Sequence, residues 1–275
     1  MEAVDYLIIF LLGSLGGFLS GFLGVGGGIV YVPILDYFLS KLGLTNDDLV
    51  KAILANSLFT IIFSGSISSY KQYRLGNFYP REIFFTAITG IVSAVGMTLL
   101  IRSGSWYSKT VFSYFFAGML LVIALRMFGS KSKPQQVVTD QKSKATGFSV
   151  TGFVAGIITA MSGLGGGVVM TPIFTDILKQ DIKKASSISN GVIPFFAVAV
   201  GILNLASTPS TYVSNWQVGY IVFPVIVPMI LSAMLFAPIG VTYSQKAKPQ
   251  LIRLVFAIFV TLVFLKTVYA IYFTS

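Results

Sequence analysis

Long apolar stretches separated by short polar turns run along the whole chain. The pattern predicts helices at residues 4–23, 29–40, 48–70, 80–101, 108–128, 148–162, 168–178, 185–206, 217–241 and 251–273. A helix needs about 20 apolar residues to span the hydrocarbon core of a bilayer, and most of these segments reach that length. The segments at 29–40, 148–162 and 168–178 are shorter, and each lies beside a cluster of glycines. The pattern predicts an all-α fold, a polytopic transmembrane helix bundle.

Composition makes a bilayer the expected surroundings of these helices. Of the 275 residues, 55% are hydrophobic and 10% are charged, and the mean hydropathy is +0.85. Soluble domains carry about 25% charged residues. The formal net charge is +10, and in a membrane protein such an excess of Lys and Arg collects in cytoplasmic loops and sets orientation. We therefore expect a multi-pass protein of the cell (plasma or inner) membrane. Its expected partner is the lipid bilayer, and the positive charge is not expected to bind nucleic acid.

The residue types present allow only a narrow range of chemistry. The chain has no Cys and no His, which excludes a disulfide framework, a thiolate metal site and the usual proton shuttle near neutral pH. We expect no metal, no cofactor and no enzymatic activity, because no paired carboxylates stand at metal-ligand spacing. A signal peptide begins with positively charged residues, but this chain has the acidic residues Glu2 and Asp5 there. The first segment is therefore expected to be a retained helix and not a signal peptide.

Two glycine-rich elements interrupt the apolar pattern in the same way. "LGVGGGIVYVP" (Leu23–Pro33) and "SGLGGGVVMTP" (Ser162–Pro172) have their glycines and their proline at matching positions. The sequences that precede them are also alike, "GFLSGF" at 17–22 and "GFVAGI" at 152–157. We interpret this as an internal duplication, with a first transmembrane repeat at 1–128, a cytoplasmic linker at 129–147 and a second transmembrane repeat at 148–275. Duplicated membrane halves are typical of transporters.

The distribution of Lys and Arg predicts the orientation. With the linker placed inside, most of the 19 Lys and Arg residues also fall inside, in the linker and in the loops at 71–81, 179–184 and 242–253. Positive charge accumulates on the cytoplasmic side. If each broken pair of segments leaves and returns on one side, the first half starts outside and the second half starts inside. The prediction is two inverted repeats, each with a Gly-rich broken helical hairpin, and two extracytoplasmic termini.

The glycine clusters form the first candidate site. Irregular backbone within a bilayer is tolerated only where protein or a water-filled cavity covers it. A helix that starts after such a break presents free N–H donors and a partial positive charge, and glycine lets an anion approach the backbone closely. The expected substrate-binding residues are Gly26, Gly27, Gly28, Tyr31, Gly165, Gly166, Gly167 and Thr171. The alternative is close helix packing, which small residues also allow.

At these residues the chain resembles the TauE/SafE family, the sulfite exporter-like permeases of the 4-toluene sulfonate uptake permease family. The resemblance rests on the two glycine elements, on "KAILANSLFTIIFSGSISSYKQYRLGN" (Lys51–Asn77) and on its weaker counterpart "KASSISNGVIPFFAVAVGILNLA" (Lys184–Ala206). It covers essentially the whole chain. It implies transport of sulfur oxyanions or organosulfonates across the cell membrane, without fixing the substrate or the direction.

Polar residues inside the predicted helices are further candidates. Asn56, Ser57 and Asn190 sit at repeat-related positions, and their side chains can donate hydrogen bonds to sulfonate oxygens. They can equally bond across helices as structural contacts. The second half adds Asn204 and Gln217. The cations expected along the route of an anion are Arg74, Lys51 and Lys184, although a charge near the inner surface also serves as an orientation signal.

Together these features predict a secondary transporter with a small anionic substrate. The resemblance implies that this anion contains sulfur, as sulfite or a small organosulfonate such as sulfoacetate. We expect it to be moved by alternating access and held between two Gly-rich helix N-termini. Two alternatives stay open: an anion channel with the same glycine elements, and a non-transporting membrane scaffold or receptor subunit. The direction of transport, the coupling ion and the formation of a homodimer also stay open.

Overall fold

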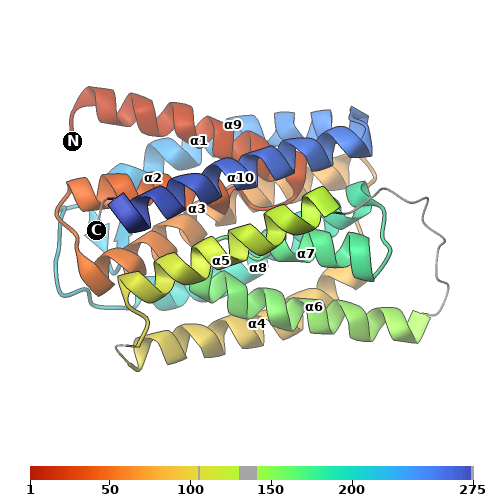
Figure 1. Ribbon diagram of the computed structural model, residues 1–275, viewed down its shortest axis with the longest axis horizontal. Coiled ribbons are helices and arrows are strands. Elements are labelled where there is room, and N and C mark those ends of the chain that lie inside the picture. Colours follow the sequence, from red (N-terminus) through yellow and green to blue (C-terminus); the bar gives the residue numbers. More distant parts are fainter. Residues whose placement is uncertain (105, 130–140, 274–275) are drawn as a thin grey trace.

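The computed structural model describes residues 1–104, 106–129 and 141–273 and consists almost entirely of helices (Figure 1). The first half contains α1 (Ala3–Leu23), α2 (Gly28–Lys41), α3 (Asn46–Arg74), α4 (Pro80–Arg102) and α5 (Lys109–Gly129). The second half contains α6 (Gln141–Ser162), α7 (Gly167–Pro172) with the π-helical turn η1 (Ile173–Ile177), α8 (Ile182–Leu205), α9 (Phe223–Lys246) and α10 (Pro249–Phe273). A short hairpin of β1 (Gln217–Val218) and β2 (Ile221–Val222) precedes α9.

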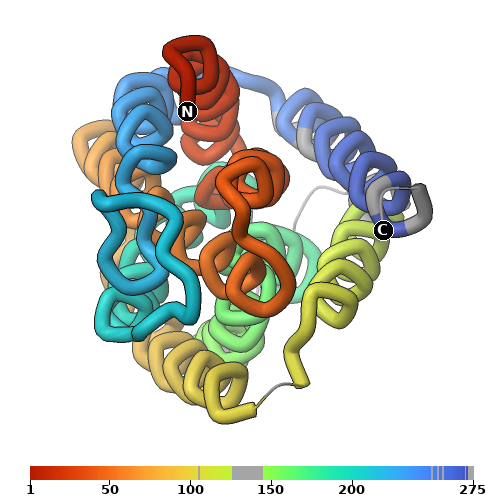
Figure 2. The backbone as a smooth tube through the Cα atoms, turned by 90° about the vertical axis from the view of Figure 1, so that its left-hand side faces the viewer, coloured from red at the N-terminus to blue at the C-terminus, as the bar shows by residue number. Residues whose placement is uncertain are grey.

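The helices form the polytopic bundle that the sequence predicts. In the described part of the chain, seven helices are long and apolar enough to cross a membrane: Ala3–Leu23, Asn46–Arg74, Pro80–Arg102, Ala145–Ser162, Ile182–Leu205, Phe223–Lys246 and Gln250–Tyr269. The short helix α2 lies inside the ring of longer helices (Figure 2), and most of its side chains are buried. The all-α transmembrane fold is thus confirmed.

Both chain termini lie at one end of the bundle. The N- and C-terminal ends of the chain are on the left of Figure 1, together with the turn between α2 and α3, the turn between α4 and α5, and the loop 206–222. The turns between α3 and α4, between η1 and α8 and between α9 and α10 lie at the opposite end. We call these the termini end and the opposite end. Which end faces the cytoplasm stays a prediction.

The helices of the two halves pack in reciprocal pairs. Helix α1 packs along α9, and α6 packs along α4; α3 contacts α9, and α8 contacts α4. Helix α3 also crosses α8, and α5 packs on α10. The first helix of each half therefore rests on the fourth helix of the other half. A two-fold relationship between the two halves would produce this pairing. The inverted duplication itself stays a prediction.

Small residues let the paired helices approach to backbone contact. A Cβ atom added to Gly17 of α1 would lie 2.5 Å from the Cα atom of Ala233 in α9, and the Cβ of Gly152 in α6 would collide with the carbonyl oxygen of Thr86 in α4. Close backbone approach at small residues is the usual way that helices associate in membranes. Part of the glycine content therefore serves packing, as the alternative in the sequence analysis allowed.

Two helix starts differ more than the others from the predicted ones. The single helix predicted at 217–241 is wrong: residues 217–222 form the β1–β2 hairpin, and α9 begins at Phe223 with Pro224 in its first turn. The hairpin turns at Gly219, which has a left-handed φ of +56°. Helix α6 begins at Gln141, inside the segment 129–147 expected as linker. Residues 130–140 of that segment lie outside the described part of the chain.

Candidate functional site

Each glycine element breaks a helical hairpin with the same backbone conformation. The φ angles are +75°, +80° and +81° at Gly24, Gly26 and Gly27, and +70°, +72° and +74° at Gly163, Gly165 and Gly166. Only glycine adopts this region without strain. Helix α2 then starts at Gly28 and α7 at Gly167, and neither has a side-chain N-cap. We call residues 24–28 the first break and residues 163–167 the second break. The repeated sequence motif is therefore also a repeated backbone path.

The two breaks lie directly against each other. A Cβ atom on Gly28 would lie 2.6 Å from the Cα atom of Leu164 and 2.9 Å from the carbonyl oxygen of Gly163. A Cβ atom on Gly167 would lie 2.6 Å from the carbonyl oxygen of Gly24 and 2.7 Å from the Cα atom of Val25. The contact is main chain on main chain, and each side of it uses the equivalent glycine. The predicted glycine residues of both clusters are thus brought together.

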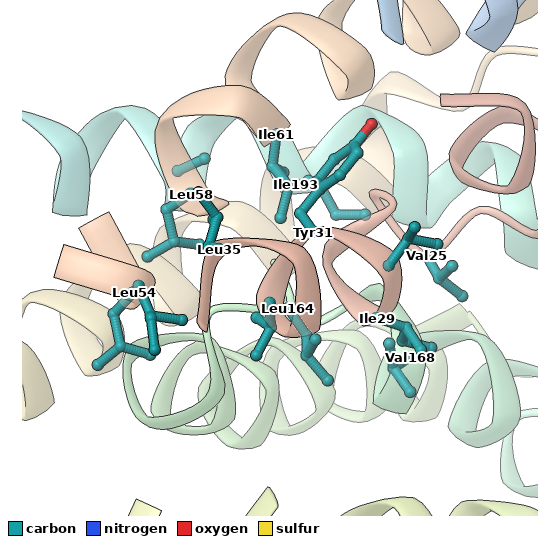
Figure 3. Close-up of a cluster of buried hydrophobic side chains, with 14 of the residues drawn as sticks. Val25, Ile29, Tyr31, Leu35, Leu54, Leu58, Ile61, Leu164, Val168 and Ile193 are labelled. Atoms are coloured by element: carbon teal, nitrogen blue, oxygen red, sulfur yellow. The ribbon is translucent and has the colours of Figure 1, made fainter. Parts of the chain in front are cut away.

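Apolar side chains fill the space beside the two breaks. Gly26 and Gly165 both face Ile61 of α3 and Ile193 of α8, at 3.3 and 3.1 Å from their added Cβ atoms. Figure 3 shows these isoleucines with Val25 and Leu164 in one buried cluster. The N-termini of α2 and α7 therefore open onto apolar side chains in this conformation. An anion at this place requires Ile61 and Ile193 to move.

Tyr31 and Thr171, which follow the glycines, are held within the hairpins. The ring of Tyr31 packs against Gly16 and Gly27 and is fully buried. The hydroxyl of Thr171 lies 3.2 Å from the Ser189 hydroxyl and donates to the carbonyl oxygen of Gly24 over 3.5 Å. Thr171 therefore links the second hairpin to the first break.

The two repeat-related asparagines have different surroundings. Asn56 Nδ2 donates to the carbonyl oxygens of Ala52 and Tyr220, each over 2.7 Å, and its Oδ1 accepts from the amide of Val222 over 2.8 Å. Asn56 therefore fixes the β1–β2 hairpin against α3. Asn190 is equally buried, but neither its Oδ1 nor its Nδ2 has a partner among the described residues. An unpartnered buried polar group costs about 1–3 kcal/mol, so Asn190 is the amide that is available to a ligand or a water.

Ser57 has a structural partner. Its hydroxyl donates to the carbonyl oxygen of Gly163 over 2.7 Å. The bond ties α3 to the second break across the interface between the halves. Sequence analysis left open whether Ser57 contacts the substrate or bonds across helices, and in this conformation its donor bonds to the main chain.

The predicted cations lie in three different places. Lys51 lines a pocket at the termini end with Leu54, Arg102, Asn204 and Tyr220. Arg102 was not among the predicted site residues. A signal was present in the sequence, because Arg102 ends an apolar helix on the side of the membrane expected to be poor in cations.

Lys184 lines a separate pocket at the opposite end with Arg81 and Glu82. Its Nζ lies 2.9 Å from Glu82 Oε1 and 4.6 Å from the centre of the Tyr79 ring. The charge of Lys184 is therefore neutralised by an acid, unlike that of Lys51. Arg74 is exposed and donates to the Tyr70 hydroxyl over 3.2 Å. It lines neither pocket.

Comparison with known proteins agrees with this architecture. The sequence profile of the family described as "Sulfite exporter TauE/SafE" matches residues 9–267. A probable membrane transporter protein of Methanocaldococcus jannaschii is 26% identical over 249 residues, which cover 90% of this chain and 89% of that protein. A probable membrane transporter protein of Haemophilus influenzae is 26% identical over 265 residues, covering 94% and 96%. The probable membrane transporter protein YunE of Bacillus subtilis is 23% identical over 285 residues, covering 97% and 98%. No solved structure matches the chain. The chain belongs to the TauE/SafE family of membrane transporters.

Proposed function

We propose that this protein is a secondary transporter that moves a small sulfur-containing anion, sulfite or a small organosulfonate such as sulfoacetate, across the cell membrane. The observation that carries the proposal is the contact of the two glycine breaks inside the bundle. Each break starts a helix without a side-chain cap, and such helix starts present N–H donors and positive charge. The family description supplies the sulfur chemistry.

The anion binds at the breaks after Ile61 and Ile193 move aside. The amides at the starts of α2 and α7 then face it from the two halves, as glycine permits close approach. Asn190 lies one turn before Ile193 in α8, and its buried amide has no partner in the described part of the chain. We assign the side-chain contact with the anion to Asn190. Asn56 is withdrawn from this role, because its amide is already used by the hairpin backbone.

Transport follows an alternating-access mechanism. A pocket with cationic residues lies at each end of the bundle, and both pockets are lined by α4, α6 and α8. Between the two pockets, Phe196 of α8 packs against Gly90 of α4, so the helices are closed there. We propose that the two halves are inverted repeats which rock about the breaks and open one pocket at a time towards the centre. In this proposal both termini are extracytoplasmic.

Flux through purified protein tests the proposal. Proteoliposomes are assayed for uptake of labelled sulfite and sulfoacetate, with chloride, sulfate and carboxylates as competitors. Saturable flux of a sulfur anion, lost in Asn190→Ala, is the expected result. Flux of carboxylates alone contradicts the sulfur chemistry, and unsaturable current identifies a channel. Absence of flux under every ion gradient contradicts a transport function.

A further inference from the structure

The pocket at the termini end carries two cations and no acid in its lining. Lys51 comes from α3, Arg102 from α4, and Asn204 from α8, and Leu54, Ala160 and Val200 supply apolar walls. The neighbouring acid, Asp48, is already occupied, because it accepts hydrogen bonds from the Tyr220 hydroxyl and the Ser210 amide, each over 3.1 Å. Asp48 keeps its charge, but it is one acid beside two cations, so the pocket and its rim together retain a positive charge.

The polar groups of this pocket retain donors without acceptors. Arg102 Nη2 donates to Asn204 Oδ1 over 2.9 Å, which leaves the Nδ2 group of Asn204 as the free end of the amide. That group is buried and has no partner among the described residues, and Asn204 is only 7% exposed. Lys51 forms no hydrogen bond or ion pair with any described residue. The Arg102 guanidinium and the Asn204 amide thus meet at a pocket that Lys51 also lines.

These donors select a particular class of ligand. Several N–H donors and a positive charge match an anion with more than one acceptor oxygen, which a guanidinium can bind through two parallel bonds. The space beside the side chains admits about one water molecule in this conformation. We infer that Lys51, Arg102 and Asn204 form a binding site for a small oxyanion such as sulfite or sulfate. Such an anion is larger than one water, so the side chains must move apart to admit it, and an aryl sulfonate would require a much larger displacement.

The side chain of Leu54 lies both at this site and at the second break. Leu54 lines the pocket, and its Cδ2 lies 3.2 Å from a Cβ atom added to Gly163. Ala160, which also lines the pocket, lies in the last turn of α6, three residues before Gly163. This step rests on the proposed transport function. The site is the position where the anion first binds at the termini end, and movement of the Leu54 side chain lets the anion reach the breaks.

Direct binding tests the site independently of flux. Isothermal titration calorimetry with sulfite uses the full-length protein in lipid nanodiscs, as wild type, Lys51→Gln, Arg102→Gln and Lys109→Gln. Loss of one adjacent charge is expected to weaken sulfite binding at least about tenfold in the first two variants. Lys109→Gln is the matched control, because Lys109 is an exposed cation at the same end outside the pocket, and its affinity is expected to equal that of the wild type.

Two further measurements keep the test decisive. Lys51→Gln removes no bond of the described structure, so its thermal stability is expected to equal that of the wild type even if Arg102→Gln, which loses the bond to Asn204, unfolds. Benzenesulfonate is expected not to compete with sulfite. Unchanged affinity in Lys51→Gln, or no binding by the wild type at millimolar sulfite, overturns the site. Sulfite binding that depends on Lys51, in a protein that shows no flux, would support the site and contradict the transport function. Saturable flux with an unchanged KM in Lys51→Gln and Arg102→Gln would support transport and contradict the site.

Discussion

The side-chain amide of Asn56 donates to the carbonyl oxygen of Tyr220 over 2.7 Å, and so joins the middle of α3 to a hairpin more than 160 residues later in the chain. The same side chain also accepts from the amide of Val222. These bonds satisfy backbone groups that would otherwise be buried without partners, since Tyr220 and Val222 are both buried. The relationship holds residues 217–222 in their non-helical path.

Asn56→Ala and Asn190→Ala are expected to have opposite effects. Asn56→Ala leaves the carbonyl of Tyr220 and the amide of Val222 unsatisfied, and each such group costs about 1–3 kcal/mol. We expect Asn56→Ala to lose thermal stability clearly. We expect Asn190→Ala to keep most of its thermal stability but to bind sulfite much more weakly. Thermal unfolding and calorimetry on the two purified variants check this. A large stability loss in Asn190→Ala would show that its amide has a structural partner.

The breaks are expected to reject even a methyl group. In Gly27→Ala, the new Cβ would lie 2.7 Å from the carbonyl oxygen of Gly16 and 2.8 Å from the Tyr31 ring. Gly76 is the matched control, since it has a left-handed φ of +71° and nothing within 4 Å of an added Cβ. Gly76→Ala is expected to cost about 1–2 kcal/mol from backbone strain alone, and Gly27→Ala more. Equal unfolding temperatures in the two variants would contradict the close contact at the first break.

Truncation of Ile193 is expected to raise basal anion flux. The side chain fills the space between Gly26 and Gly165, so Ile193→Ala opens room in front of both helix starts. A buried Ile→Ala change costs about 2–5 kcal/mol of stability, and flux is therefore compared per molecule of folded protein. Val192→Ala is a suitable control, because Val192 is also fully buried in α8. Lower flux in Ile193→Ala than in the control would contradict a blocking role for Ile193.

Flux of a permanent sulfonate is expected to be constant between pH 6 and 8. The chain has no His, and no other side chain with an ordinary pKa changes its charge in that range. Sulfoacetate uptake measured against pH checks the expectation, and a slope would reveal a titrating carboxylate.

At the rim of the termini-end pocket, burial and the neighbouring Asp48 raise the pKa of Tyr220 to about 12. The hydrogen bond from its neutral hydroxyl to Asp48 therefore contributes stability below pH ~10, the ordinary pKa of Tyr, and that contribution is lost as the pH rises through 12.

Periodicity and glycine spacing are enough to predict most of the fold. Apolar length predicts the spanning helices, and the matching positions of Pro33 and Pro172 predict two equivalent hairpins, because these signals are local in sequence. The hairpin at 217–222 escapes the same analysis because "QVGYIV" is as apolar as the helix that follows it. Pro224, which favours the first turn of a helix, was the available signal for the true start of α9.

The candidate site is only partly predictable from the sequence. Repeat matching pairs Asn56 with Asn190 and treats them as equals, since nothing local to Asn56 reveals its bond to Tyr220. The pocket at the termini end combines Lys51, Arg102 and Asn204 from three helices. Such a combination depends on how α3, α4 and α8 cross, and a hydropathy pattern contains no information about helix crossing.

The contact between the breaks also restricts how the molecule moves. A surface made of side chains can yield by rotating a χ angle, but Gly28 and Gly167 have no side chains, and their neighbours across the contact are backbone atoms. The contact therefore cannot yield by side-chain rotation, and only a change of backbone torsions at the glycines relieves it. We expect a hairpin that moves with its backbone path unchanged either to carry the other hairpin with it or to break the contact. In the first case the breaks would act as a mechanical linkage between the two hairpins.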